Sequence, residues 1–314
     1  MTTINRRELL LAAAAAGAHA SPAMALPAAR SASGKQPTLC YFSKPLPFMD
    51  YATLGKALHE MGFAGVDLTV RPQGHVLPEN VAADLPKAHK ALKDHGVEIS
   101  MITTGLTSAE DPAARPTLQT AAKLGVPFYK LGYYRMSEEE LVDLDGLLRR
   151  VKAQVEGLAA IGGHAGIKGG FHNHSGRYVG SAMWDHWHIL RDIEPDWIGF
   201  YFDPCHATIE GGDAGWKIGF HRLASRLNMV AIKDFYWEKR NGKWERIICP
   251  LGEGMVDFPA FFKMLAASGF SGPISLHIEY EIETHSEAAK REKTLQASEK
   301  DFAYLKKQME AAFG

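Results

Sequence analysis

The stretch that decides the fold runs from Lys168 to Gly212 and reads KGGFHNHSGRYVGSAMWDHWHILRDIEPDWIGFYFDPCHATIEGG. It contains two short apolar runs, Lys168–His172 and Trp197–Asp203, and between them a segment, Met183–Ile193, whose apolar residues recur at helical spacing. Strand, helix and strand in this order predict the βαβ unit of a parallel sheet. Each apolar run ends in polar residues, and ligands of parallel barrels bind at such strand ends.

The same alternation of apolar runs and helical patterns extends outward over residues 37–314. The predicted strands are Thr38–Phe42, Gly65–Val70, Glu98–Thr103, Phe128–Gly132, Ile167–His172, Ile198–Asp203, Met229–Lys233 and Ile274–Glu279. The predicted helices are Tyr51–Met61, Asn80–His95, Pro116–Leu124, Glu138–Ile161, Met183–Ile193, Trp216–Leu227, Phe258–Ser268 and Ser286–Met309. Eight strand–helix units in about 280 residues predict an α/β fold, a single-domain (β/α)8 TIM barrel.

A doubly wound sheet is the main alternative to the barrel. It normally carries a Gly-rich phosphate-binding turn after its first strand, where this sequence has Ser43–Pro47 instead.

Two local signals refine the barrel prediction. Ser137 and Glu140 have the spacing of a capping box at the start of the long helix. Residues 236–256 form an insertion after strand seven, with Asn241-Gly242 as a hairpin turn, and we expect it to lie over the barrel mouth.

Residues 1–30 differ in composition from the rest of the chain. Arg6-Arg7 precedes a run rich in Ala and Leu, and the run ends in Ala23-Met24-Ala25, which is the order of regions in a secretory signal peptide. The Arg pair before Glu8-Leu9-Leu10 resembles a twin-arginine signal. An uncleaved amphipathic helix is the alternative. We therefore expect export to the periplasm, by a route that allows a protein to fold and load a metal first.

The composition excludes several other classes of protein. The 314 residues are 46% hydrophobic and carry a net charge of −1, so the charge gives no reason to expect nucleic acid or an anionic membrane as partner. The three cysteines are far apart and make neither a disulfide framework nor a CxxC zinc site. Beyond the signal there is no apolar run of about 18 residues, so we expect no membrane contact after cleavage.

Side chains with metal-ligand or acid–base chemistry follow the predicted strands two to eight. They are Arg71, His75, Thr103, Thr104, Lys130, Tyr133, Tyr134, His172, His174, Asp203, His206, Lys233, Asp234, His277, Glu279 and Glu281. Each has an ordinary explanation when taken alone, and Asp203 in particular has the position of a helix N-cap. Their presence at four consecutive strand ends favours one shared site. Imidazole with carboxylate suits Mn, Co, Zn, Fe or Ni.

Two of these elements carry a resemblance to a known family. Phe202-Asp203-Pro204-Cys205-His206 resembles the D-x-x-H element, and Ile278-Glu279-Tyr280-Glu281 resembles the I-E-x-E element, of the sugar phosphate isomerase/epimerase branch of the xylose-isomerase-like TIM barrels. The resemblance runs from about Gln36 to the C-terminus. It implies a divalent metal ion (Mn, Co, Zn or Mg) held by Asp203 and Glu279, with His206 near metal or substrate.

Two positions depart from the family pattern. His172 in His172-Asn173-His174 stands where most members have a Glu ligand, and Ala231 in Ala231-Ile232-Lys233-Asp234 replaces the usual His ligand of strand seven. The metal ligands implied for this chain are therefore His172, Asp203, Glu279 and His206, with His174 as an alternative to His206. The loss at Ala231 leaves occupancy and identity of the metal open.

The resemblance implies proton transfer next to a carbonyl on an unphosphorylated sugar or glycoside. Glu279 would be ligand and base, and His206 and Lys233 would polarise the substrate oxygen. The residues expected to bind substrate are Arg71, His75, Lys130, His174 and His277. Elimination from a keto-sugar or a 3-keto-glycoside by the same site is the alternative reaction, and a non-catalytic sugar-binding barrel is the alternative function. An abasic-site endonuclease, also in the superfamily, is disfavoured by the near-neutral charge. Homo-oligomerisation stays open.

Overall fold

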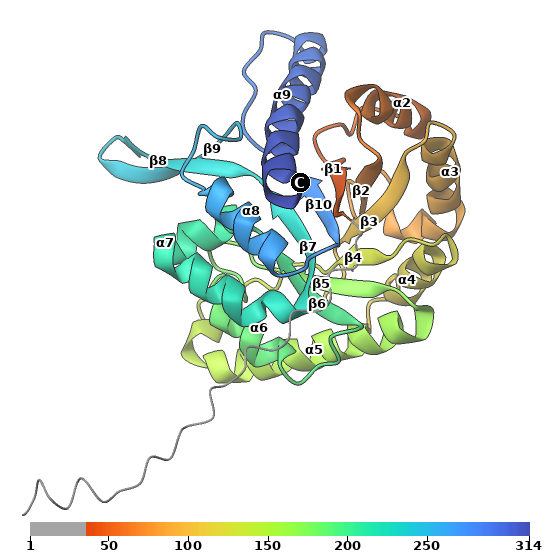
Figure 1. Ribbon diagram of the computed structural model, residues 1–314. Helices are drawn as coiled ribbons and strands as arrows, with labels where there is room; N and C mark the ends of the chain where they lie inside the picture. The colour runs from red at the N-terminus through yellow and green to blue at the C-terminus, as the bar shows by residue number, and fades with distance from the viewer. Residues whose placement is uncertain (1–35) are drawn as a thin grey trace, which may run out of the picture.

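Eight parallel strands close into a barrel in the computed structural model, which describes residues 36–314 (Figure 1). The strands of the barrel are β1 (Thr38–Phe42), β2 (Gly65–Val70), β3 (Glu98–Thr104), β4 (Phe128–Lys130), β5 (Lys168–His172), β6 (Ile198–Phe202), β7 (Leu227–Ile232) and β10 (Pro273–Leu276). The helices are α2 (Tyr51–Met61), α3 (Val81–Lys93), α4 (Ala114–Lys123), α5 (Leu144–Ala165), α6 (Met183–Leu190), α7 (Pro204–Leu223), α8 (Phe258–Ala267) and α9 (Glu287–Phe313). The predicted single-domain (β/α)8 barrel is confirmed. The predicted signal peptide lies outside the described residues.

The alternation of side chains along each strand separates the core from the barrel interior. On β6, Phe200 and Phe202 point outward, and the ring of Phe202 stacks on Phe261 of α8 with centroids 5.5 Å apart. Tyr201 between them points into the barrel and packs with Met229 and Ala231 of β7. The next inward position is Asp203, directly after the strand. The pleat of β6 thus places Asp203 at the carboxyl end of the barrel interior.

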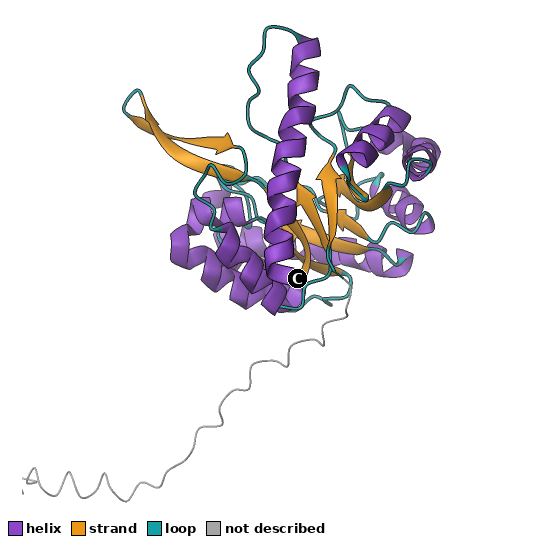
Figure 2. Cartoon of the chain, turned by 45° about the horizontal axis from the view of Figure 1, so that its top comes forward, coloured by secondary structure: helices purple, strands orange, loops and turns teal. Residues whose placement is uncertain are grey.

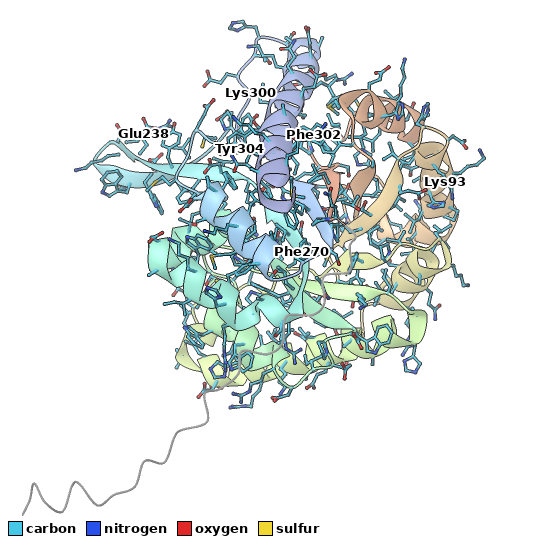
Figure 3. The ribbon with its side chains drawn as sticks, viewed as in Figure 1. Lys93, Glu238, Phe270, Lys300, Phe302 and Tyr304 are labelled. Atoms are coloured by element: carbon cyan, nitrogen blue, oxygen red, sulfur yellow. The ribbon has the colours of Figure 1, made fainter. Side chains whose placement is uncertain are left out.

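The pairing of β10 with β1 closes the barrel, and helix α9 covers these two strands (Figure 1). Figure 3 shows Phe302 on the side of this helix that faces α2, and Tyr304 on the side that faces α8. The ring of Phe302 lies 4.0 Å from that of Phe63, and Tyr304 meets Phe258 edge to face at 5.8 Å. Among the described helices, none is both long and apolar enough to cross a membrane.

Two helices, α5 and α7, begin more than two residues away from the predicted start. The capping box of Ser137 and Glu140 forms, since each residue's side chain accepts a hydrogen bond from the other's backbone N–H, but it closes only a short 3-10 turn. Helix α5 begins later, at Leu144, because the Asp143 carboxylate caps it by accepting from Gly146 N. Helix α7 begins at Pro204 rather than Trp216, and it kinks at Gly212, where φ is 58°.

The insertion after β7 is an antiparallel hairpin of β8 (Asp234–Arg240) and β9 (Lys243–Cys249). Asn241 and Gly242 join the strands with φ of 49° and 80°, the left-handed conformation that a tight two-residue hairpin turn requires. Figure 2 shows the hairpin projecting beyond the ring of helices. Its base is the part that reaches the mouth of the barrel, as described below.

Asp234 fastens the base of this hairpin. Its buried carboxylate accepts hydrogen bonds from the backbone N–H groups of Phe235 and Val256 at Oδ1, and of Gly252 and Gly254 at Oδ2. Replacing Asp234 by Ala leaves these donors unpaired, and we expect the free energy of unfolding to fall by about 2–4 kcal/mol. Urea unfolding followed by circular dichroism measures this. The matched change Asp213→Ala removes only an exposed pair with Lys217 and should cost less than about 1 kcal/mol. Equal losses in both variants would contradict the assigned anchor role.

Candidate active site at the carboxyl end of the barrel

Three buried side chains converge where β5 and β6 end. His172 is the last residue of β5, Asp203 follows β6, and His206 lies in the first turn of α7. Asp203 Oδ2 lies 3.4 Å from His172 Nε2 and 3.7 Å from His206 Nε2. Within residues 36–314 these three atoms have no hydrogen-bond partner, although buried polar atoms nearly always have one. They are the atoms that a metal ion would bind.

The other polar atoms of this cluster are held by the protein. Asp203 Oδ1 caps α7 by accepting a hydrogen bond from His206 N at 3.0 Å, so one carboxylate both starts the helix and presents its second oxygen to the barrel. His172 Nδ1 lies 3.0 Å from the Tyr133 hydroxyl, and His206 Nδ1 lies 2.8 Å from Ser175 Oγ. With Nδ1–H donating in both rings, each Nε2 keeps its lone pair for the centre of the cluster.

The protonation states match those of metal ligands. Burial, together with the Lys130 and Lys233 charges, holds the pKa of His172 well below its ordinary value. Burial and Lys233 do the same to the pKa of His206. Burial raises the pKa of Asp203, but Lys233 and His206 outweigh it and lower the pKa. Two neutral imidazoles and one carboxylate are thus ready to bind a divalent ion without losing a proton first. The donor set fits Mn, Co or Zn better than Mg or Ca.

Glu279 lies beside this cluster but outside it. Its Oε2 accepts a hydrogen bond from Lys233 Nζ at 2.7 Å, and its Oε1 accepts one from Lys44 Nζ at 2.5 Å. Lys233 Nζ also lies 3.4 Å from Asp203 Oδ2, so its ammonium bridges the two carboxylates. Burial raises the pKa of Glu279, but Lys233, His277 and Lys44 hold it well below its ordinary value. Three of the four residues expected to hold metal therefore group together, and the fourth is paired with lysine.

The departure at Ala231 has a structural counterpart. Ala231 is fully buried in the cluster at the floor of the barrel interior, with Tyr201 and Met229. Lys233, two residues later on the same face, reaches up to Asp203 and Glu279. An ammonium group thus lies between the two carboxylates that the family pattern assigns to metal.

His174 and His277 flank the cluster on opposite sides. The His174 ring lies 4.0 Å from that of His206, its Nδ1 is 2.8 Å from Ser175 O, and burial lowers its pKa to about 4. His277 stacks on Phe42, and its Nε2 lies 3.2 Å from the Tyr201 hydroxyl. His277 Nδ1 lies 3.9 Å from Glu279 Oε2. The His174 ring therefore lies beside His206, and the His277 ring lies beside Glu279.

His75 has different surroundings. Its Nδ1 lies 3.1 Å from Thr69 Oγ1 of β2, and its Nε2 lies 3.1 Å from Leu46 O, so the ring joins the loop after β2 to the end of β2 and to the loop after β1. In this structure His75 holds two loops together, and its contact with a substrate hydroxyl stays a prediction. Arg71 follows β2, across the barrel from β6, and Lys130 ends β4, the strand that pairs with β5.

The sequence analysis missed four residues that shape the site. The Asn173 amide pairs with the backbone of Asp203 through two hydrogen bonds and so fixes β5 to β6. Arg246, on β9, donates to Ser175 Oγ and connects the hairpin to His206. Lys44 pairs with Glu279. Asn173 and Ser175 adjoin the predicted histidines and were within reach of that pattern. Nothing in the sequence relates Arg246 or Lys44 to the site, because their contacts join distant segments.

Comparisons with known proteins agree with this fold. The family model described as Xylose isomerase-like TIM barrel matches residues 56–308. The fold is similar to that of 3-keto-D-glucoside 4-epimerase from E. coli (TM-score 0.65, 18% identity, covering 87% of this chain and 100% of the other). It is similar to D-psicose 3-epimerase with D-tagatose from Clostridium cellulolyticum H10 (0.66, 12%, 87% and 99%). It is also similar to a xylose isomerase-like protein from Mycobacterium smegmatis in complex with magnesium (0.65, 15%, 89% and 98%). No curated protein matches the sequence. At these identities the structural likeness shows the fold.

Proposed function

Since the chain belongs to the xylose isomerase-like TIM barrel family, we propose that it is a metal-dependent isomerase or epimerase of unphosphorylated keto-sugars or keto-glycosides. The single observation that carries the proposal is the convergence, within the described residues, of three buried ligand atoms that make no hydrogen bond, beside the Lys233–Glu279 pair. Two proteins of similar fold are epimerases. One is named for a 3-keto-glucoside and the other is a psicose epimerase with bound tagatose, which supports this substrate class.

The residues of this chain have separate tasks in the proposed reaction. His172, Asp203 and His206 would hold a divalent ion, which supplies Lewis-acid polarisation of a substrate oxygen. Glu279 removes the proton from the carbon next to the carbonyl, and that C–H electron pair forms the C=C bond of an enediolate. Lys233 donates a hydrogen bond to the oxygen that gains the negative charge. The proton then returns to the other carbon, or to the other face of the same carbon.

Glu279 is paired with two lysines before substrate enters. Lys44 is half exposed at the mouth, whereas Lys233 is buried. A substrate hydroxyl that replaces Lys44 at Oε1 frees this oxygen to act as base, while Lys233 keeps Oε2 in place. Because the low pKa of Glu279 makes it a weak base in the free protein, we propose that displacement of Lys44 raises its basicity on binding.

Metal analysis of the purified mature chain tests the proposal. We expect about one transition-metal ion per chain by elemental mass spectrometry, after reconstitution with Mn, Co or Zn if the ion is lost on purification. Ketoses and 3-keto-glycosides are then incubated with the enzyme in D2O, where an isomerase exchanges the carbon-bound proton for deuterium. Release of a leaving group without exchange into substrate would indicate the alternative elimination. Sugar binding with neither metal nor turnover would overturn the proposal and favour a binding barrel.

We also propose that the protein acts in the periplasm. The support is the predicted signal at residues 1–30 and a substrate without phosphate, because phosphorylated sugars are retained in the cytoplasm.

A further inference from the structure

Two cationic side chains at the mouth of the barrel have neither a hydrogen-bond acceptor nor an ion-pair partner among residues 36–314. Lys130, at the end of β4, is only 3% exposed, and its Nζ lies 3.3 Å above the ring of Tyr133. It makes no hydrogen bond or ion pair through its ammonium group. Arg71, just after β2, has a buried Nε without a hydrogen-bond partner, and its guanidinium pairs with no carboxylate. Within the described residues neither cation therefore has a carboxylate in ion-pair contact, although Asp67 and Glu279 attract Lys130 from a greater distance.

The other cations at the mouth are compensated. Lys44 and Lys233 both pair with Glu279, and Lys233 also contacts Asp203. The carboxylate nearest the floor, Asp67, accepts hydrogen bonds from the hydroxyls of Thr103 at 2.7 Å and Ser275 at 2.9 Å. It is not paired with Arg71 or Lys130. The two unpaired cations thus lie over β2 and β4, with Arg71 across the barrel from β6 and Lys130 beside β5.

A buried cation without a partner is costly, and two neighbouring ones repel each other. Burial and the Arg71 charge together lower the pKa of Lys130 well below its ordinary value, which shows how unfavourable its protonated form is in the free protein. A bound anion would relieve both costs at once. Such an arrangement is typical of a site whose missing partner is part of the ligand.

We propose that Arg71 and Lys130 bind a carboxylate of the substrate, so that the enzyme acts on a sugar acid such as a uronate or a keto-aldonate. This rests on the proposed function for the sugar part of the ligand. The carboxylate lies on the β2–β4 side, and the carbons that exchange protons lie between it and Glu279. Arg71 supplies a planar pair of donors, which suits two carboxylate oxygens, and Lys130 adds a point charge.

The local backbone favours carboxylate over phosphate. Phosphate sites usually add several free backbone N–H groups to the side-chain donors. In the loop after β2 the N–H groups of Arg71, Gly74, His75 and Val76 are already bonded within the loop. Pro72 has none to offer. Beside the side chains, this loop therefore leaves only the N–H of Gln73 for an anion, fewer backbone donors than a phosphate site usually has.

Calorimetric binding to matched pairs of sugars tests the proposal. The pairs are D-glucuronate with D-glucose, D-galacturonate with D-galactose, and D-fructuronate with D-fructose, and inorganic phosphate is measured separately. We expect at least one acid to bind about tenfold or more tighter than its neutral partner. This preference should fall about fivefold or more in both Arg71→Met and Lys130→Met. Lys168→Met, which removes one exposed positive charge at the opposite end of the barrel, should keep it.

Melting temperature gives a second, independent measurement. If the ion-pair partner of Lys130 is supplied only by a bound anion, Lys130→Met removes an unpaired buried charge from the free protein. Its melting temperature should then stay equal or rise. Equal binding of acids and neutral sugars, or a preference that survives both variants, would overturn the proposal. Tight binding of phosphate that both variants lose would replace the carboxylate by a sugar phosphate. A chain that prefers acids but holds no metal would keep this site and refute only the proposed mechanism.

Discussion

Glu279→Gln is expected to lower kcat about 10³-fold while metal content and folding stay unchanged. Gln keeps the size of Glu and one acceptor oxygen, which can still face the buried Lys233, while the half-exposed Lys44 can turn to solvent; Gln cannot accept the carbon-bound proton. Removal of a positioned general base typically costs between about 10² and 10⁴ in rate. The measurement is deuterium exchange into the substrate, with kcat and KM determined separately.

Glu281→Gln is the matched control, because Glu281 belongs to the same Ile278-Glu279-Tyr280-Glu281 segment but is exposed. It should stay within about twofold of the unchanged enzyme, as surface substitutions usually do. If Glu279→Gln raised KM and left kcat unaltered, Glu279 would bind substrate and another group would be the base. His174, with a pKa of about 4 and a ring beside His206, would then be examined first.

The sequence was sufficient to predict the fold and many of the side chains at the mouth of the barrel. Strand periodicity places Asp203 and Lys233 at inward positions, because a parallel barrel leaves few alternatives once the strand ends are known. It left the start of α7 open, since Asp203 has the position of a helix cap and also that of a candidate ligand, and a motif does not separate two oxygens of one carboxylate. Only coordinates show that Oδ1 caps the helix and that Oδ2 faces His172, His206 and Lys233.

Charge pairing was the part that sequence reasoning could not reach. Glu279 looked like a free ligand in the sequence, but in the structure both of its oxygens contact lysines, one from 46 and one from 235 positions away. The same limit applies to Lys130, which is significant because no carboxylate of the described residues forms an ion pair with it. Which charges are paired depends on contacts between distant segments, and these follow from the packed barrel rather than from spacing along the chain.

Asp203→Asn is expected to remove the bound metal and to leave the fold intact. The Asn side-chain oxygen still accepts the hydrogen bond from His206 N, so α7 keeps its cap, and the free energy of unfolding should change by less than about 2 kcal/mol. The atom facing His172 and His206 becomes an amide NH2, which carries no charge and offers no lone pair to a cation. Loss of a residue that only hydrogen-bonds to a ligand lowers metal affinity by about 10- to 100-fold, so loss of a ligand itself should lower it further.

Asp257→Asn separates the two roles of Asp203. Asp257 caps α8 through Ala260 N in the same way, but it lies outside the group of three candidate ligands. We expect this variant to bind metal and turn over substrate normally. If Asp203→Asn kept its metal as well, the ion would be held elsewhere, and the three unpartnered atoms would need another explanation. If it lost metal yet kept its turnover, Lys233 between Asp203 and Glu279 would be the electrophile, and the ammonium would have taken over the role of the ion that Ala231 no longer helps to bind.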